Sequence, residues 1–305
     1  MTIRLLITLT SLFSGFAAAA CGDDGGTPLP DAGRDIGFNK PTASLKSNME
    51  TAPNMYTELG PADLSCLGMP ANDPATTVAV ALSTKVRDFQ SNNPVPNTVV
   101  TVFRDQDTGS IIDTKTADAN ADVTVTILAG VKRFGFKMTD PSALDTLLLN
   151  QRVNSTNPTQ TLTAIQSVSK TTATLLPALI GVSRTAGSGV LAGALRDCAG
   201  REVSNFIATV SSTRGSVTHL VGADTYYFSP SVGLPVKHNQ QASGSPDGLF
   251  MIIELPATPT AFVQVWGYPT DADLAGDQLK LIAELSTAVI ADTVITGSYE
   301  PLRTP

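Results

Sequence analysis

The chain has 305 residues, of which 42% are hydrophobic and 15% charged, and it carries a formal net charge of -7. Enough apolar side chains are present to bury a core, and the mildly acidic balance argues against nucleic acid as a partner, because phosphate binding depends on clustered Lys and Arg. After residues 5–20, no apolar stretch approaches the roughly 20 residues that a membrane-spanning helix requires.

The first 21 residues follow the pattern of an export signal. Arg4 precedes a short apolar run, and the run ends in small residues directly before Cys21. A basic start, a short apolar centre and small residues before the cut are typical of removable signals. With Cys21 at this position, residues 1–20 resemble a bacterial lipoprotein signal peptide. The resemblance implies that Cys21 becomes the lipidated first residue of the mature chain. The alternative is a plain secretory signal with Cys21 nearby by chance.

Residues 21–61 are predicted to form a flexible acidic tether. They are mostly Gly, Pro, Asp, Asn, Ser and Thr, with single apolar residues and no sustained period. Such a segment buries too little apolar surface to offset its ordering entropy. An alternative, an N-terminal arm packed on the first domain, applies best to its last part, around residues 59–67.

Residues 62–166 are predicted to form a β-sandwich. Turn residues recur every eight to twelve positions between segments rich in Val, Thr and Ile, which suit a pleated and half-buried surface. Regular turns between period-two strands are typical of sandwiches. The expected strands cover residues 78–89, 95–103, 111–116, 123–127 and 133–137.

Several motifs in this first sandwich carry a resemblance. Arg87-Asp88, a turn, the segment 94–100, Asp118-Ala119-Asn120 and a closing Ala129-Gly130 resemble a carboxypeptidase regulatory-like domain. The resemblance implies a small transthyretin-like Greek-key β-sandwich that is generally a non-catalytic attachment. Ala121 stands where the family usually has Gly after its Asp-Ala-Asn turn.

The same pattern recurs in the second half of the chain. Residues 195–198 and 202–210 match the first copy almost position for position, and residues 245–250 supply the turn and strand. We therefore predict an all-β chain with two tandem transthyretin-like Greek-key β-sandwiches, the second over residues 187–305. Its last part, residues 279–299, is expected to form a final hairpin.

Between the copies, residues 167–186 are predicted to form a linking helix. Leucine and isoleucine recur at helical spacing over residues 175–180, with Ser at the front and Gly181 behind. Ser167 and Lys170 also fit the Ser-x-x-Lys pattern of penicillin-binding enzymes, but the companion motifs are missing and a helix cap is favoured.

The sequence offers few residues for catalysis or metal binding. His219 and His238 lie in no ligand or triad motif and are expected at the surface. Asp118, Asn120 and Asp122 alternate as at the start of a calcium loop, but the Gly and Glu of a complete loop are missing, and a turn is favoured. We expect no enzymatic activity, no cofactor and no bound metal.

The sequence leaves two alternatives for Cys66 and Cys198: a disulfide bridge between them, or two unpaired side chains. Once Cys21 is acylated, Cys66 and Cys198 are the remaining thiols, and disulfides persist in an oxidising compartment. A bridge would fix the orientation of the two domains relative to each other. Alternatively, Cys198 is a buried apolar residue, because it occupies the repeat position of Phe89.

Together these patterns predict a lipid-anchored, non-enzymatic cell-envelope protein with a structural or adhesive role. Gly22, in place of the Asp associated with inner-membrane retention, favours the outer membrane. The expected partners are the membrane, through the lipid, and an envelope glycan or another surface protein. The alternative function is carbohydrate binding, with Trp266 and Tyr268 stacking on the sugar from one side of a strand unless they belong to the core. A third, an enzyme hidden in residues 213–243, is opposed by the scarcity of His in the chain and by the absence of paired acids in that segment.

Overall fold

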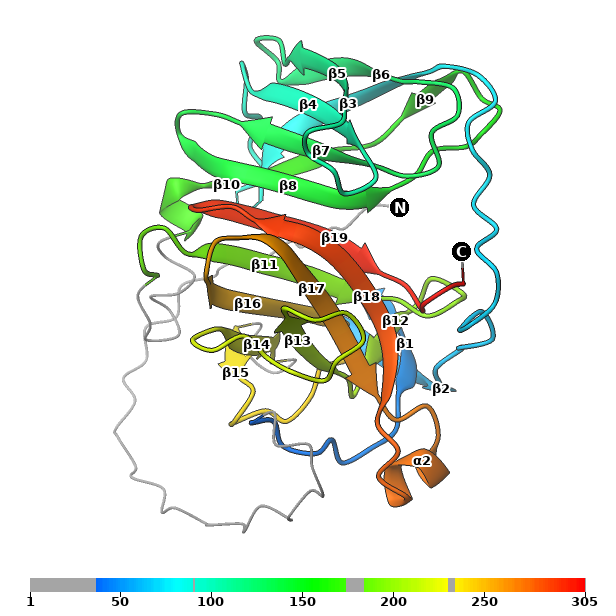
Figure 1. Cartoon of the computed structure of the whole chain (residues 1–305). Helices are drawn as coiled ribbons and strands as arrows, with labels where there is room; N and C mark the ends of the chain where they lie inside the picture. The colour runs from blue at the N-terminus through cyan, green and yellow to red at the C-terminus, as the bar shows by residue number, and fades with distance from the viewer. Residues whose placement is uncertain (1–36, 90, 174–183, 230–233, 305) are drawn as a thin grey trace.

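The computed structural model describes residues 37–89, 91–173, 184–229 and 234–304. These residues are almost entirely strands, and the all-β prediction is confirmed. Figure 1 shows two β-sandwich units stacked on each other.

The first unit contains eight strands. They are β3 (Val80–Asp88), β4 (Val99–Arg104), β5 (Ile111–Thr116), β6 (Asp122–Ile127), β7 (Phe134–Thr139), β8 (Ala143–Gln151), β9 (Thr159–Thr161) and β10 (Ile165–Ser169). Every second residue of β3 and β6 is buried, as the period-two pattern requires. The inward side chains, among them Val86, Val125 and Phe136, form one apolar core.

The second unit combines the C-terminal half of the chain with its N-terminal arm, residues 37–66. Its strands are β1 (Lys46–Ala52), β2 (Met55–Pro61), β11 (Gly189–Leu195), β12 (Glu202–Ser204), β13 (Ile207–Ser211), β14 (Asp224–Phe228), β15 (Pro235–Lys237), β16 (Leu249–Leu255), β17 (Thr258–Gly267), β18 (Lys280–Val289) and β19 (Thr293–Tyr299). A short helix, α2 (Asp271–Ala275), joins β17 to β18.

The two units share most of their strand pairings. In the first, β3 pairs with β6 and β10, and β4 pairs with β7, which pairs with β8. In the second, β11 pairs with β16 and β19, and β13 pairs with β17, which pairs with β18. These pairings recur in the same chain order, but β8 also pairs with β10, so the strands of the first unit form one continuous sheet, whereas β13, β17 and β18 form a separate sheet in the second.

The turn that marks the repeat has the same backbone in both units. Ala121 has φ 65° and Gly248 has φ 70°, both in the left-handed region. The carbonyl of Ala121 accepts from the N–H of Val86 at 2.9 Å, and that of Gly248 accepts from Leu195 at 2.9 Å. The substitution of Ala for Gly therefore leaves the geometry of the turn in place.

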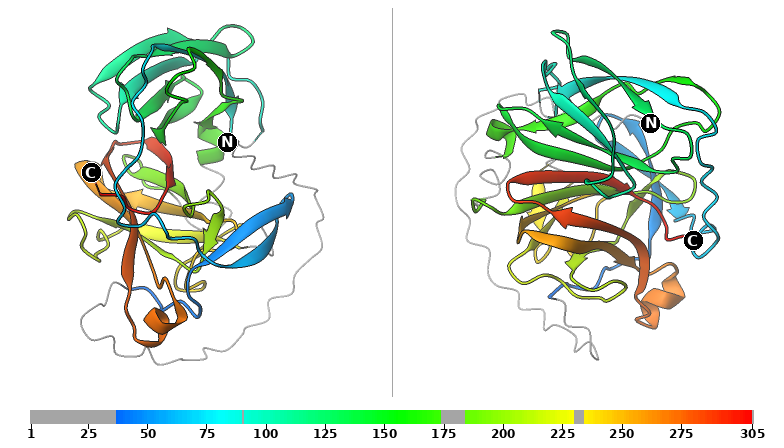
Figure 2. Two further views of the ribbon diagram at one scale, coloured as in Figure 1. Left: turned by 90° about the vertical axis from the view of Figure 1, so that its right-hand side faces the viewer. Right: turned by 45° about the horizontal axis from the view of Figure 1, so that its top comes forward.

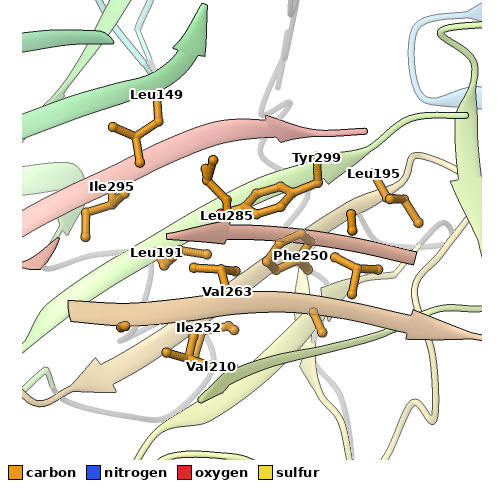
Figure 3. Packing of buried hydrophobic residues seen from close by; sticks show 14 of the residues in the cluster. Leu149, Leu191, Leu195, Val210, Phe250, Ile252, Val263, Leu285, Ile295 and Tyr299 are labelled. Carbon is orange, nitrogen blue, oxygen red and sulfur yellow. The ribbon is translucent and has the colours of Figure 1, made fainter. Parts of the chain in front are cut away.

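A shared sheet joins the units. Residues Asp145 to Leu149 of β8 pair in parallel with Thr293 to Gly297 of β19, so that one sheet continues from the first unit into the second. Leu149 packs in the same core as Phe250 and Tyr299 (Figure 3). The rings of Phe250 and Tyr299 lie 5.2 Å apart between their centroids. The units are therefore one body with a common core and not two independent sandwiches.

The tether prediction was wrong over Lys46–Pro61. These residues form the β1–β2 hairpin, and β1 pairs antiparallel with β12. Leu45 is fully buried against Gly267. A Cβ added at Gly267 would lie only 2.6 Å from Leu45 Cδ2, so the close packing depends on glycine there. One apolar anchor and one strand pairing hold a segment whose composition alone indicates disorder. Figure 2 shows the hairpin, in blue, extending from the second unit.

The linking helix does not begin at residue 167. Ser167 lies in β10, and helical backbone starts at Lys170, with the Ser169 hydroxyl accepting from the N–H of Thr172 at 3.1 Å. The structure describes this turn to Ala173, and the predicted helix from there to residue 183 lies outside the described residues.

The final hairpin prediction was also wrong. β18 pairs with β17, whereas β19 lies between β8 and β11 in the other sheet. A sequence of two strands separated by a turn is compatible with a hairpin and also with a connection that passes from one sheet to another. None of the helices in the described part of the chain is long and apolar enough to cross a membrane.

Candidate functional site

A polar pocket lies in the first unit, where β3 and β10 end and β8 begins. Its volume is about 490 Å³. Eight of its twelve lining residues carry a hydroxyl or a carboxylate. The polar ones are Asp88, Ser91, Asp140, Ser142, Ser167, Ser169, Thr171 and Thr172, and the others are Pro94, Val95, Pro96 and Ala143. We call this recess the Asp88 pocket.

Two carboxylates are fixed in the wall of the Asp88 pocket. Asp88 Oδ1 accepts from the N–H and the hydroxyl of Ser91 at 2.8 and 2.9 Å, and its Oδ2 accepts from the N–H of Ser169 at 3.2 Å. Asp140 Oδ1 accepts from the N–H of Ser142 at 2.8 Å and from the Ser142 hydroxyl. These hydrogen bonds fix the positions of both carboxylates in the wall of the pocket.

Ser167, a lining residue of the same pocket, has an unsatisfied hydroxyl. The residue is 1% exposed, and its Oγ has no hydrogen-bond partner among the described residues. Lys170 donates its Nζ to the carbonyl of Pro141 at 2.7 Å, so no bond joins the two residues of the Ser-x-x-Lys pattern. A buried hydroxyl without a partner carries a desolvation cost, which makes Ser167 the most unusual polar group of the pocket.

In the second unit, the arm fills the corresponding place. Asp197 is the repeat counterpart of Asp88, and its Oδ2 accepts from the hydroxyl of Ser47 at 2.5 Å and from the N–H of Asp63 at 3.4 Å. The carbonyl of Asp63 accepts from the N–H of Cys198 at 2.8 Å, just as the carbonyl of Ser167 accepts from Phe89. The chain's own arm thus lies at the end of the second unit that corresponds to the pocket end of the first, with Asp63 in the place of Ser167.

Prolines explain why no similar strand from the described residues covers the first unit. Pro94 bridges to Arg87, as Glu202 bridges to Arg196 in the second unit. β1 pairs with Glu202–Ser204, whereas the first unit has Pro94 and Pro96 at the corresponding positions. Proline has no N–H for a ladder, and prolines on an edge oppose strand addition.

The structure pairs Cys66 with Cys198 in a disulfide. Their Cα atoms lie 5.8 Å apart, and 132 positions separate them in the sequence. The bridge ties the arm to the β11–β12 turn of the second unit. It encloses the whole first unit in one covalent loop.

Trp266 and Tyr268 do not form an exposed sugar platform, and that hypothesis was wrong. The two residues are 7% and 3% exposed. Trp266 Nε1 donates to Thr209 Oγ1 at 3.2 Å, and the Tyr268 hydroxyl donates to Asp277 Oδ1 at 2.5 Å. Both aromatic side chains belong to the packed interior of the second unit.

The two histidines are half-buried, which corrects the expectation of surface residues. His219 Nδ1 accepts from the N–H of Val210 at 3.1 Å, so its Nε2 donates to the carbonyl of Ala223 at 3.0 Å. Burial lowers the pKa of His219 to about 4 and also lowers the pKa of His238. The ring of His238 stacks on Phe38 at 4.2 Å. These histidines are packing residues of the second unit and its arm.

The Asp118 motif forms a turn. Asp118 Oδ1 accepts from the N–H groups of Asn120 and Asp122 at 2.8 and 2.9 Å. Within the described ranges, no three His, Cys, Asp or Glu residues gather as a metal site would require. The signal segment and Cys21 lie outside the described residues.

The sequence reasoning missed the Asp88 pocket. Its members come from three segments that are distant along the chain and carry no shared motif. The signals present were the pair Pro94 and Pro96, which opposes strand addition at that edge, and a run of Ser and Thr residues over 167–172.

No protein-family model matches the chain, and no curated protein matches it. Among solved structures, the Bacillus anthracis TIE protein is similar at 13% identity and a TM-score of 0.25, over 73% of this chain and 34% of that one. The chain thus spans about a third of the length of that protein. The shaft pilin SpaA of Lactobacillus rhamnosus GG is similar at 11% identity and a TM-score of 0.21, over 74% and 98% of the two chains. A minor pilin of Streptococcus agalactiae has 8% identity and a TM-score of 0.20, over 74% and 98%. All three TM-scores are low, and the function proposed for this chain rests on its own residues.

Proposed function

We propose that the protein is an exported, lipid-anchored, non-enzymatic envelope protein with a structural or adhesive role, built from two carboxypeptidase regulatory-like sandwiches. Export is supported by the signal pattern of residues 1–20 and by the bridge between Cys66 and Cys198, since disulfides persist outside the reducing cytosol. The lipid on Cys21 would hold the chain on the membrane, and Gly22 favours the outer membrane.

The single observation that carries the structural role is the sheet shared through β8 and β19. Domains within one chain usually meet over modest, polar interfaces and move relative to each other. Here five residue pairs in a parallel ladder and a common apolar core connect the units. A body of this kind keeps its shape under load, which suits a rigid spacer or an adhesive surface held away from the membrane.

Amide hydrogen exchange tests the rigid body. The amides of Leu147 in β8 and Ile295 in β19 are expected to exchange only when the whole protein unfolds, because both residues lie in the shared ladder. The matched comparison is Tyr56 of β2, on the outer edge of the arm. Fast exchange at Leu147 and Ile295 would show two bodies that separate.

Fatty-acid labelling tests the anchor. In cells fed a labelled fatty acid, Cys21→Ala is expected to lose the label and to stay uncleaved or leave the membrane fraction. Cys66→Ala is the control, because it removes a different cysteine and leaves Cys21 intact. Label retained by the Cys21 variant would overturn the anchoring proposal.

Carbohydrate binding is the alternative function, and the burial of Trp266 and Tyr268 removes its predicted platform. A sugar would therefore have to bind elsewhere on the chain. A glycan array probed with the full chain separates this function from adhesion through protein contacts.

A further inference from the structure

We propose that the Asp88 pocket binds one uncharged sugar residue. The class of ligand follows from the wall of the pocket. Only the source of the sugar, a glycan of the cell envelope, rests on the proposed function.

The polar wall suits a polyhydroxylated ligand. The carboxylates of Asp88 and Asp140 accept hydrogen bonds only, whereas the six surrounding hydroxyls both donate and accept. Sugar hydroxyls do both as well, so each can find a partner here. The volume of about 490 Å³ lies within the usual range for small-molecule sites.

Ser167 supplies the strongest pointer to a ligand. Ser167 is a lining residue of the pocket, and its Oγ is buried and unpartnered among the described residues. Most buried polar groups in native proteins have a partner, and exceptions call for an explanation. A ligand hydroxyl bound to Ser167 Oγ provides it.

An apolar shelf completes the site. Pro94, Val95, Pro96 and Ala143 line the pocket beside the polar groups. A pyranose ring presents C–H groups on its faces and hydroxyls around its rim. The shelf suits a face and the Ser, Thr and Asp residues suit the rim.

Other ligand classes fit less well. Pro94 and Pro96 cannot donate to a peptide strand, which is the occupant of the corresponding place in the second unit. The described residues provide no cluster able to hold a metal. An anionic sugar would bring its charge beside Asp88 and Asp140, and like charges repel in a recess.

The second unit predicts the stoichiometry. There, Ser47 and Asp63 of the arm already donate to Asp197, the counterpart of Asp88. We therefore expect one such site in the described part of the chain, although the scaffold is repeated.

The test is a titration of the purified full chain, followed by saturation-transfer NMR and calorimetry. The probes are methyl glucoside, methyl galactoside, methyl mannoside and N-acetylglucosamine, with methyl glucuronide as the anionic match of glucose. At least one uncharged probe is expected to bind once per chain, and the glucuronide at least about tenfold more weakly than the glucoside.

Two variants locate the site. Ser167→Ala is expected to weaken binding about tenfold, the usual effect of losing one hydrogen bond, without loss of thermal stability. Thr84→Val is the matched control, because Thr84 also has a buried, unpartnered hydroxyl but does not line the pocket. It is expected to bind as the parent does.

Three results would overturn the proposal: no uncharged probe binds, Ser167→Ala binds as tightly as the parent, or the glucuronide binds as well as the glucoside. Competition by Ca²⁺ for the same signals would also overturn it in favour of a cation site. None of these results depends on Cys21, so failure of the anchor and failure of the sugar site are distinguishable.

Discussion

The first and second units carry the same repeat but are completed differently. In the second, the arm lies over the β12 edge, donates to Asp197 and is fixed by a disulfide. In the first, Pro94 and Pro96 occupy that edge, and the region around Asp88 stays hollow. The comparison teaches that the repeated turns set the scaffold, while the segment laid across one end decides whether a unit is closed or has a pocket.

Removing the disulfide tests most strongly how the second unit is closed. The double variant Cys66→Ala/Cys198→Ala is expected to lose about 4 to 5 kcal/mol in free energy of unfolding, because the bridge closes a loop of 132 positions. Urea denaturation of the parent with and without reductant provides the matched measurement. Thiol titration of the denatured parent without reductant should find neither cysteine, and two reactive thiols per chain would contradict the bridge.

The repeat turn gives a second contrast. Gly248→Ala is expected to cost about 2 to 4 kcal/mol, because φ is 70° and the new Cβ would lie 2.8 Å from the carbonyl oxygen of Leu195. Gly222→Ala is the control, since Gly222 also has positive φ but open space around it. It should cost only about 1 to 2 kcal/mol by denaturant unfolding. Equal losses would mean that the contact with Leu195 contributes nothing.

Two serines at corresponding ends should respond differently. Ser47→Ala removes a donor to the buried carboxylate of Asp197 and is expected to cost about 1.5 to 3 kcal/mol. Ser167→Ala removes an unpartnered hydroxyl and should leave stability unchanged or slightly higher. Thermal unfolding of both variants side by side checks this. A large loss in the Ser167 variant would reveal a structural partner.

The smallest expected effect concerns pH. Burial raises the pKa of Asp247 to about 7, from about 4 in the unfolded chain, whereas Asn120 at the same turn position of the first unit does not titrate. The unfolded chain therefore binds fewer protons than the folded one between pH 4 and 7, and stability falls as pH rises through this window.

Asp247→Asn should remove that fall. The variant is expected to match the parent near pH 4 and to exceed it by roughly 1 to 2 kcal/mol at pH 8, after allowance for the partial exposure of the side chain. Denaturant unfolding at both pH values measures it. An unchanged pH slope would place Asp247 in contact with water.

The sequence predicted what is local. Alternation in β3 and β6 and the turns at Asp118 and Asp247 identified strands and a repeat, because both signals lie within a dozen residues. Pairings between distant segments, such as β1 with β12 and β8 with β19, leave no local trace. The same limit explains why the final two strands were taken for a hairpin.

The candidate site was predictable only in part. Cys66 and Cys198 were named as a possible bridge from compartment and count alone, and the distance between them required the fold. Trp266 was named for its aromatic ring, but the side of β17 that faces the core depends on sheet packing. The Asp88 pocket depends on three chain segments whose meeting point follows from topology.

The arm has a consequence for how the chain folds during synthesis. Residues 46–61 emerge from the ribosome well before the partner of β1, Glu202–Ser204, which follows about 150 positions later. By then the first unit, whose strands lie between the two, has all its residues available and can form its sheets locally. The β1–β2 hairpin therefore docks late, and the second unit cannot be completed until β1 meets β12.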